Sequence, residues 1–196
     1  LRQSFGTVQL TADLSTITSG TSGDPHVWLD PVLMVKQAES IRDAFIQEDP
    51  ANANTYLNNA AALINQLNAL DQEYSSGLST CKDRRIVTSH DAFTYLAKRY
   101  NLEVLPIAGL SPDEEPSAGR LAELTDEVKK QKITTIFFET LASAKLAQTL
   151  AKETGAKTSI LNPIEGLLPA QERQGEDYLS LMRQNLSALR KALGCS

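Results

Sequence analysis

The chain contains two histidines, and both stand in settings where an imidazole could bind a metal ion. His26 lies in "GDPHVWLDP", where Pro25 on one side and Asp30-Pro31 on the other restrict the backbone. His90 lies in "IVTSHDAF", directly after an apolar run. Imidazole nitrogen suits zinc, and a metal site needs ligands that are held rigidly. A single histidine more often forms a hydrogen bond to a backbone carbonyl in the protein interior. The residues around His26 and His90 therefore have to show whether either one is a metal ligand.

Two further polar residues follow apolar runs that we expect to be strands. Glu139 closes the run "IFFET", and Asn162 stands in "SILNP". Ligands of open α/β sheets bind at the carboxyl ends of the strands, so both residues are candidate metal ligands beside His90. As alternatives, Glu139 caps the next helix or forms a salt bridge, and Asn162, which precedes Pro163, is a turn residue.

A histidine beside a carboxylate could also serve in catalysis. The candidate pairs are His90 with Asp91 and His26 with Asp30. The sequence has no nucleophile elbow, no HExxH motif and no second base at catalytic spacing. We therefore expect a binding protein and not an enzyme, with Asp24 and Asp30 as hydrogen-bond acceptors that orient His26.

From Cys81 onward, short apolar runs alternate with amphipathic segments. This alternation is typical of a parallel sheet with helices on both faces. It predicts a C-terminal α/β lobe over residues 80–196, built on four parallel strands. The expected strands are 85–88, 103–107, 133–138 and 158–161, and the expected helices are 91–100, 117–131, 143–154 and 174–193.

The first part of the chain has two helix-start signals of the same kind, Asp30-Pro31 and Asp49-Pro50. They predict a helix over 31–48 and a long second helix that ends at Gly77. Residues 1–48 otherwise offer only a short strand near Gly6 to Leu10, too little to bury a core. We expect a partial N-terminal lobe over 1–48, an interlobe helix over 49–79, and an N-terminal portion that is missing from this sequence.

Composition excludes several classes of protein. The 196 residues are 41% hydrophobic and carry a net charge of −5, without the Lys/Arg cluster that a nucleic-acid partner requires. No apolar run approaches the roughly 18 to 20 residues of a membrane-spanning helix. The start, "LRQSF", has no initiating Met, signal peptide or lipid-attachment cysteine, so we expect any targeting segment to lie outside this sequence.

The two cysteines, Cys81 and Cys195, do not match the spacing of zinc ligands. In an oxidising compartment they could form a disulfide that closes the second part of the chain into a loop. The alternative is two unrelated thiols, and the sequence leaves both open.

The motifs together resemble the zinc and manganese solute-binding proteins of bacterial ABC transporters. The resemblance extends from Gly23 to the C-terminus, through "DPHVWLDP", "IVTSHDAFTYLAKRYNL", "GLSPDEEPSAGRL", "FFET" and "LNPIEGL", in the family's order. It implies an exported protein, periplasmic or lipid-anchored at the cell surface, with two α/β lobes joined by a long helix. It further implies a metal ion held between the lobes by a ligand early in the first lobe, by His26, by His90, and by an acidic residue at position 162.

This sequence departs from the family pattern in three ways. No histidine precedes His26, Asn162 stands where an acidic residue is expected, and "TSGTSG" replaces the His-rich loop of many zinc members. Manganese members typically have Glu at position 90, so His90 favours Zn²⁺, with Mn²⁺ as the second choice. We expect a receptor that captures Zn²⁺ and delivers it to an ABC permease in the membrane. The alternative is an adhesion or interaction lipoprotein, or a truncated receptor, without a high-affinity metal site.

Overall fold

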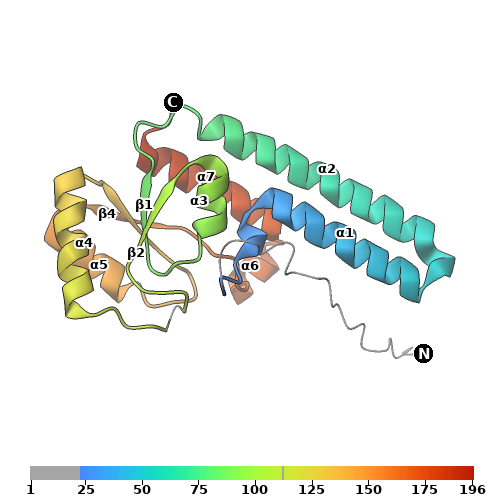
Figure 1. The fold of residues 1–196 in the computed structure, drawn as a ribbon, viewed down its shortest axis with the longest axis horizontal. Coiled ribbons are helices and arrows are strands. Elements are labelled where there is room, and N and C mark those ends of the chain that lie inside the picture. Colours follow the sequence, from blue (N-terminus) through green and yellow to red (C-terminus); the bar gives the residue numbers. More distant parts are fainter. Residues whose placement is uncertain (1–22, 112) are drawn as a thin grey trace. The chain divides into compact units, whose positions relative to one another are not determined.

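The computed structural model describes residues 23–111 and 113–196 (Figure 1). The chain forms two compact units, and the boundary between them lies within a long helix, between Asp71 and Gln72. The strand predicted near Gly6 to Leu10 lies outside the described residues. Among the helices of the described part, none combines the length and the apolar character needed to cross a membrane.

The first unit is built on helices. Its elements are the 3-10 turn η2 (Val27–Leu29), helix α1 (Pro31–Glu48), the 3-10 turn η3 (Pro50–Asn52) and helix α2 (Ala53–Gly77), which continues past the unit boundary. Helix α1 has the bounds that the sequence predicts, because the side chain of Asp30 accepts a hydrogen bond from the Val32 amide at 2.8 Å and Pro31 occupies the first helical position.

The reversal between α1 and α2 is fixed by side chains on both sides of η3. The Asp49 carboxylate accepts hydrogen bonds from the Asn52 side-chain amide at 2.7 Å and from the Tyr56 hydroxyl at 2.8 Å. The Tyr56 ring stacks on Phe45, with 5.3 Å between centroids. These contacts join the end of α1 to the start of α2, so the Asp49-Pro50 signal produces a short 3-10 turn before the helix begins at Ala53.

The second unit contains a four-stranded sheet, as predicted. Its strands are β1 (Arg85–Thr88), β2 (Glu103–Pro106), β3 (Thr135–Phe138) and β4 (Lys157–Ile160). All neighbours are parallel and the order is β2-β1-β3-β4, which brings the ends of β1 and β3 side by side at the centre. In these central strands Ile86, Val87 and Ile136 are fully buried, as expected for a sheet covered on both faces.

Helices cover both faces of this sheet. Figure 1 shows α4 and α5 on one face and α3 and α7 on the other. Residue bounds are α3 (Thr94–Tyr100), α4 (Ala118–Gln131), α5 (Lys145–Thr154), α6 (Pro169–Arg173) and α7 (Tyr178–Leu193). The predicted helix 174–193 is shorter in the structure, because Gly175 has a positive φ of 71° and Asp177 caps a new helix start. The short α6 before it was not predicted.

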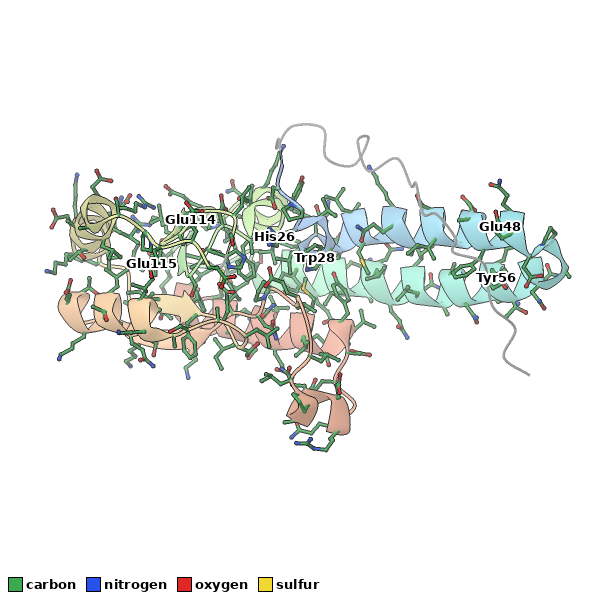
Figure 2. All side chains as sticks on the ribbon, turned by 90° about the horizontal axis from the view of Figure 1, so that it is seen from below. His26, Trp28, Glu48, Tyr56, Glu114 and Glu115 are labelled. Carbon is green, nitrogen blue, oxygen red and sulfur yellow. A yellow bond between two sulfur atoms is a disulfide. The ribbon has the colours of Figure 1, made fainter. Side chains whose placement is uncertain are left out.

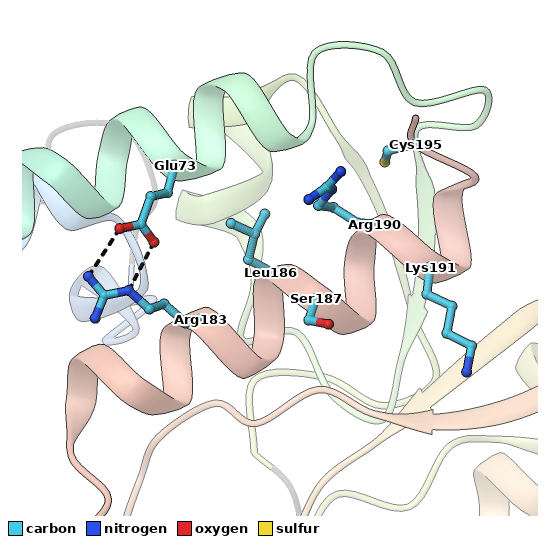
Figure 3. A pocket seen from close by; sticks show the side chains of 7 residues that line it. All are labelled: Glu73, Arg183, Leu186, Ser187, Arg190, Lys191 and Cys195. Atoms are coloured by element: carbon cyan, nitrogen blue, oxygen red, sulfur yellow. Dashed lines mark hydrogen bonds and ion pairs between the residues drawn. The ribbon is translucent and has the colours of Figure 1, made fainter.

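Two side chains on the last turns of α2 join this helix to the rest of the second unit. Tyr74 is fully buried, donates a hydrogen bond to the Met182 carbonyl at 2.6 Å, and stacks on Tyr100 with 5.0 Å between centroids. Glu73 accepts two hydrogen bonds from Arg183, at 2.9 and 3.1 Å (Figure 3). These contacts hold α7 and α3 against the end of α2.

Cys81 and Cys195 form a disulfide across 114 positions of sequence, one of the two alternatives that the sequence left open. Beside it, the Leu193 carbonyl accepts hydrogen bonds from the Lys82 and Asp83 amides at 3.1 and 3.2 Å. The end of α7 is thereby joined to the segment that leads into β1. The disulfide therefore lies near the amino end of β1, whereas His90 follows the carboxyl end of the same strand.

Candidate metal centre

His26 stands immediately before η2 and is buried. Its Nδ1 atom lies 2.8 Å from Oδ1 of Asp24, and the same oxygen accepts the backbone N–H of His26 at 3.0 Å. A ring whose Nδ1 donates to a carboxylate carries its lone pair on Nε2, the tautomer that binds a metal through Nε2. Asp24 therefore occupies the orienting position predicted for it.

The backbone around His26 is a series of tight turns. The Val27 amide donates to the Pro25 carbonyl at 2.8 Å, and the Leu29 amide donates to the His26 carbonyl at 3.2 Å. Val27 and Leu29 are buried, and the ring of Trp28 lies 5.2 Å from the His26 ring, tilted by 59° (Figure 2). Backbone hydrogen bonds within the loop and the buried side chains of Val27 and Leu29 therefore limit the movement of the His26 ring.

Asp30 was predicted to orient His26, and the structure gives its carboxylate a helix-capping role. Oδ1 of Asp30 accepts the backbone amides of Val32 at 2.8 Å and Leu33 at 3.4 Å. Asp30 thus anchors the start of α1, and α1 in turn fixes the end of the His26 loop.

His90 follows β1 in the second unit and is fully buried. Its Nδ1 atom lies 2.5 Å from Oε1 of Glu139, the residue directly after β3. Because β1 and β3 are neighbouring parallel strands, their carboxyl ends lie at one edge and the two side chains meet there. Glu139, which the sequence suggested as a metal ligand, is thus placed to orient the His90 ring. Its other oxygen, Oε2, is buried and has no hydrogen bond among the described residues.

Backbone and hydroxyl groups hold the loop that carries His90. The Thr88 hydroxyl donates to the His90 carbonyl at 2.9 Å, and the Asp91 amide donates to the Gly109 carbonyl at 2.8 Å. Glu114 lies over Gly109, where an added Cβ would be 2.1 Å from a carboxylate oxygen. A side chain at position 109 would require the Glu114 side chain to move, and the hydrogen bond between Asp91 and Gly109 keeps the segment after β2 close to the His90 loop.

Electrostatics at His90 favour a proton on the ring in the metal-free protein. Burial lowers the pKa of His90, but the hydrogen bond that the ring donates to Glu139 and the negative charges of Glu139, Glu165 and Asp91 raise it more. The net result is a pKa above the ordinary value of 6.5. A bound cation would replace that proton as the positive charge among these carboxylates.

Glu165 is the site residue that the sequence analysis missed. Its Oε1 lies 3.5 Å from Nε2 of His90, while Glu139 bonds to Nδ1 of the same ring. The signal for it was present, because Glu165 is the one carboxylate in "LNPIEGL", three positions after the residue where an acidic ligand was expected.

Asn162 has the role of a turn residue, the alternative that the sequence left open. Its side-chain oxygen accepts the Ile164 amide at 2.8 Å, and its Nδ2 atom, a donor, is buried without a hydrogen bond among the described residues. The Nδ2 group is a donor and cannot bind a cation, and Oδ1 already accepts the Ile164 amide with one of its two lone pairs. The carboxylate beside His90 is thus supplied by Glu165 and not by position 162.

Comparison with known proteins places this arrangement in a family. Residues 4–192 match the family described as "zinc-uptake complex component A periplasmic". The chain belongs to this zinc-uptake component A family. The predicted recognition is confirmed, and it covers nearly the whole chain.

Curated proteins of the zinc-uptake family are similar to this chain over most of the chain's length. Zinc-binding lipoprotein AdcA of Streptococcus pneumoniae is 52% identical over 168 residues, which are 86% of this chain and 34% of the relative. The high-affinity zinc uptake system protein ZnuA of Bacillus subtilis is 45% identical over 170 residues, which are 87% of this chain and 53% of the relative. The chain therefore spans about a third to a half of the length of these relatives.

Solved structures show the same fold. The Zn(II)-bound ZnuA-like domain of Streptococcus pneumoniae AdcA is 50% identical, with a TM-score of 0.77, and the match covers 90% of this chain and 66% of that one. The laminin-binding protein Lbp of Streptococcus pyogenes is 38% identical, with a TM-score of 0.80 over 87% of this chain and 65% of that one. The predicted α/β fold with a four-stranded parallel sheet is confirmed.

The second unit of this family member presents a donor set that suits zinc. An imidazole nitrogen and a carboxylate oxygen lie together, and zinc takes nitrogen, sulfur and oxygen ligands. Glu165 also lines a pocket of about 550 Å³. Three more carboxylates line it, those of Asp113, Glu114 and Glu115 (two of them labelled in Figure 2). Lys145 is the only cation among its lining residues, so the approach to Glu165 favours positive ions.

Proposed function

We propose that this chain is part of an extracytoplasmic receptor that captures Zn²⁺ and delivers it to an ABC permease. The observation that carries the proposal is the fully buried His90 with a carboxylate at each ring nitrogen, in a member of the zinc-uptake family. One carboxylate orients the ring and the other adds an oxygen donor beside the second nitrogen. Relatives named for zinc binding and zinc uptake support the same cargo.

The ligands that we propose are His26, His90 and Glu165. In both histidines a carboxylate bonds to Nδ1, Asp24 in one and Glu139 in the other, so both would bind through Nε2. A tetrahedral zinc site needs a fourth donor. A water molecule could supply it, or the early ligand that the family resemblance implies.

An exported location, periplasmic or lipid-anchored at the surface, follows from the same proposal. The Cys81–Cys195 disulfide supports it, because disulfides persist in oxidising compartments. The partners would then be the metal ion and the membrane permease. Nitrogen donors favour Zn²⁺ over Mn²⁺, which prefers oxygen.

Isothermal titration with Zn²⁺ and a competing chelator tests the proposal. We expect one ion per chain and a loss of affinity of more than about tenfold in His26→Ala and in His90→Ala, since each removes one of few ligands. Glu123→Ala, an exposed carboxylate on α4, is the control and should bind like the wild type. Equal affinity in all four proteins would contradict the assignment. Titration with Mn²⁺ and a screen for hydrolysis address the second metal and an enzymatic role.

The likeness to the laminin-binding protein Lbp supports a second candidate function, adhesion. Binding of the chain to immobilised laminin, with and without Zn²⁺, tests it. Laminin binding without measurable zinc affinity would favour the adhesion protein over the receptor.

A further inference from the structure

We propose that Asn162 and Asn185 are positioning residues, which hold Ile164 in a left-handed turn and thereby set the direction of the Glu165 carboxylate. This inference rests on the proposed function, in which Glu165 binds zinc. The turn before Glu165 would then contribute to metal affinity and not only connect β4 to α6.

Ile164 has a backbone conformation that its side chain disfavours. Its φ is +58°, in the left-handed region where β-branched residues are rare. Two other non-glycine residues of the described chain, Asn101 and Lys132, also have positive φ, but both cap the ends of helices, where a left-handed residue is common. Ile164 caps no helix, since it lies between β4 and α6. Such a conformation persists only where the surroundings enforce it.

Asn162 provides the local part of that enforcement. Its Oδ1 accepts the Ile164 amide at 2.8 Å, two residues along the chain, as in an Asx turn. Pro163 between them has a fixed φ and cannot relax the turn. The Asn162 side chain is buried, so water does not compete for this bond.

Asn185, on α7, supplies the long-range part. Its Oδ1 accepts the Asn162 amide at 2.8 Å, and its Nδ2 donates to the Asn162 carbonyl at 2.7 Å. Both backbone groups of Asn162 are therefore held by one buried side chain, 23 positions away. A rigid helix of 16 residues thus determines where the turn begins.

The consequence concerns Glu165, the next residue after Ile164. A change of φ at Ile164 from +58° to a common negative value would rotate the chain that follows, and with it the carboxylate 3.5 Å from Nε2 of His90. The turn thus determines whether Glu165 lies beside His90.

Replacements at position 164 separate this role from general loop stability. Ile164→Pro cannot adopt a positive φ and removes the amide that Asn162 accepts, whereas Ile164→Asn retains both, because asparagine tolerates the left-handed region. We expect Ile164→Pro to bind Zn²⁺ about tenfold more weakly or worse, and Ile164→Asn to bind within about threefold of the wild type. Asn162→Ala, which keeps Ile164 and removes the acceptor, should weaken binding in the same direction.

A double-mutant cycle with Glu165→Ala shows whether the effect passes through the carboxylate. The structure predicts that Ile164→Pro adds no more than about threefold to the loss in Glu165→Ala, since the carboxylate it would misplace is already gone. Circular dichroism verifies that each variant is folded. Wild-type affinity in both Ile164→Pro and Asn162→Ala, or fully additive losses in the cycle, would overturn the inference alone. A wild-type protein without zinc affinity would overturn the proposed function, and this inference with it.

Discussion

Oε1 of Glu139 lies 2.5 Å from Nδ1 of His90, so the residue that follows β3 holds the residue that follows β1. Both side chains are buried, and neither is more than 4% exposed. A carboxylate in this position fixes the ring orientation and makes Nε2 a better metal ligand. The relationship depends on strand order, because only neighbouring parallel strands place these two residues side by side.

Glu139→Gln should therefore weaken Zn²⁺ binding by about 10- to 100-fold, although it removes no proposed ligand. The amide can still accept a hydrogen bond from Nδ1, but it no longer supplies the negative charge that strengthens the imidazole as a donor. Competitive titration measures the change, and Glu123→Gln on α4 serves as the control. Unchanged affinity in Glu139→Gln would show that this contact has no part in metal binding.

The pH dependence has a defined sign. Because the folded-state pKa of His90 is raised, its protonation stabilises the metal-free fold fully below about pH 6.5, and this contribution is lost as the pH rises through the folded pKa. Zn²⁺ must displace the proton, so zinc affinity should fall as the pH drops through the same range. An NMR titration of the imidazole in metal-free protein measures the pKa. The pKa of His90 should decrease in Glu139→Gln, because the charge that counteracts the effect of burial is then removed. A pKa below 6.5 for His90 in the wild type would contradict the predicted pH dependence.

Glu165→Gln tests the residue that sequence reasoning missed. We expect an affinity loss of at least about tenfold, since the neutral amide oxygen is a weaker donor than the carboxylate beside His90. Asp113→Asn is the matched control, because it removes a charge from the same pocket without changing the group near the ring. If both variants lose affinity equally, the pocket would act through its total charge alone, and Glu165 would not be a ligand.

The disulfide should contribute to stability and not to zinc affinity. On the chain-entropy model, a bridge across 114 positions stabilises the fold by up to about 5 kcal/mol. Urea unfolding of the Cys81→Ser/Cys195→Ser double variant, against the oxidised wild type, measures the loss. Zinc affinity of the folded variant should equal that of the wild type, because the bridge lies near the amino end of β1 and His90 beyond its carboxyl end. Equal unfolding midpoints would contradict the prediction for stability.

Local signals in the sequence predicted most of the secondary structure. Asp30-Pro31 defines the start of α1, and the four strands lie within two residues of their predicted ranges. The predicted helix 174–193 began too early, because the positive φ of Gly175 and the capping side chain of Asp177 set the start of α7 at Tyr178. The division of the chain into lobes at 48 and 79 stays a prediction.

The sequence predicted those residues of the candidate site whose type and local position are informative by themselves. Histidines in braced loops are visible in the sequence, and so is an acidic residue after an aromatic strand. The position of Glu165 depends on the left-handed Ile164 and on two asparagines that meet across 23 positions. The family resemblance placed the acidic ligand at position 162, and Glu165, the carboxylate three positions later, was not considered; its role as a ligand stays a proposal.

X-ray absorption at the zinc edge of the zinc-loaded protein tests the central claim most directly, because it reports the atoms bound to the ion. We predict a shell of nitrogen and oxygen at about 2.0 to 2.1 Å with imidazole scattering and no sulfur. The imidazole signal should decrease in His90→Ala and in His26→Ala. A zinc–sulfur shell, or an imidazole signal that is unchanged in both variants, would contradict the claim that these histidines hold the metal.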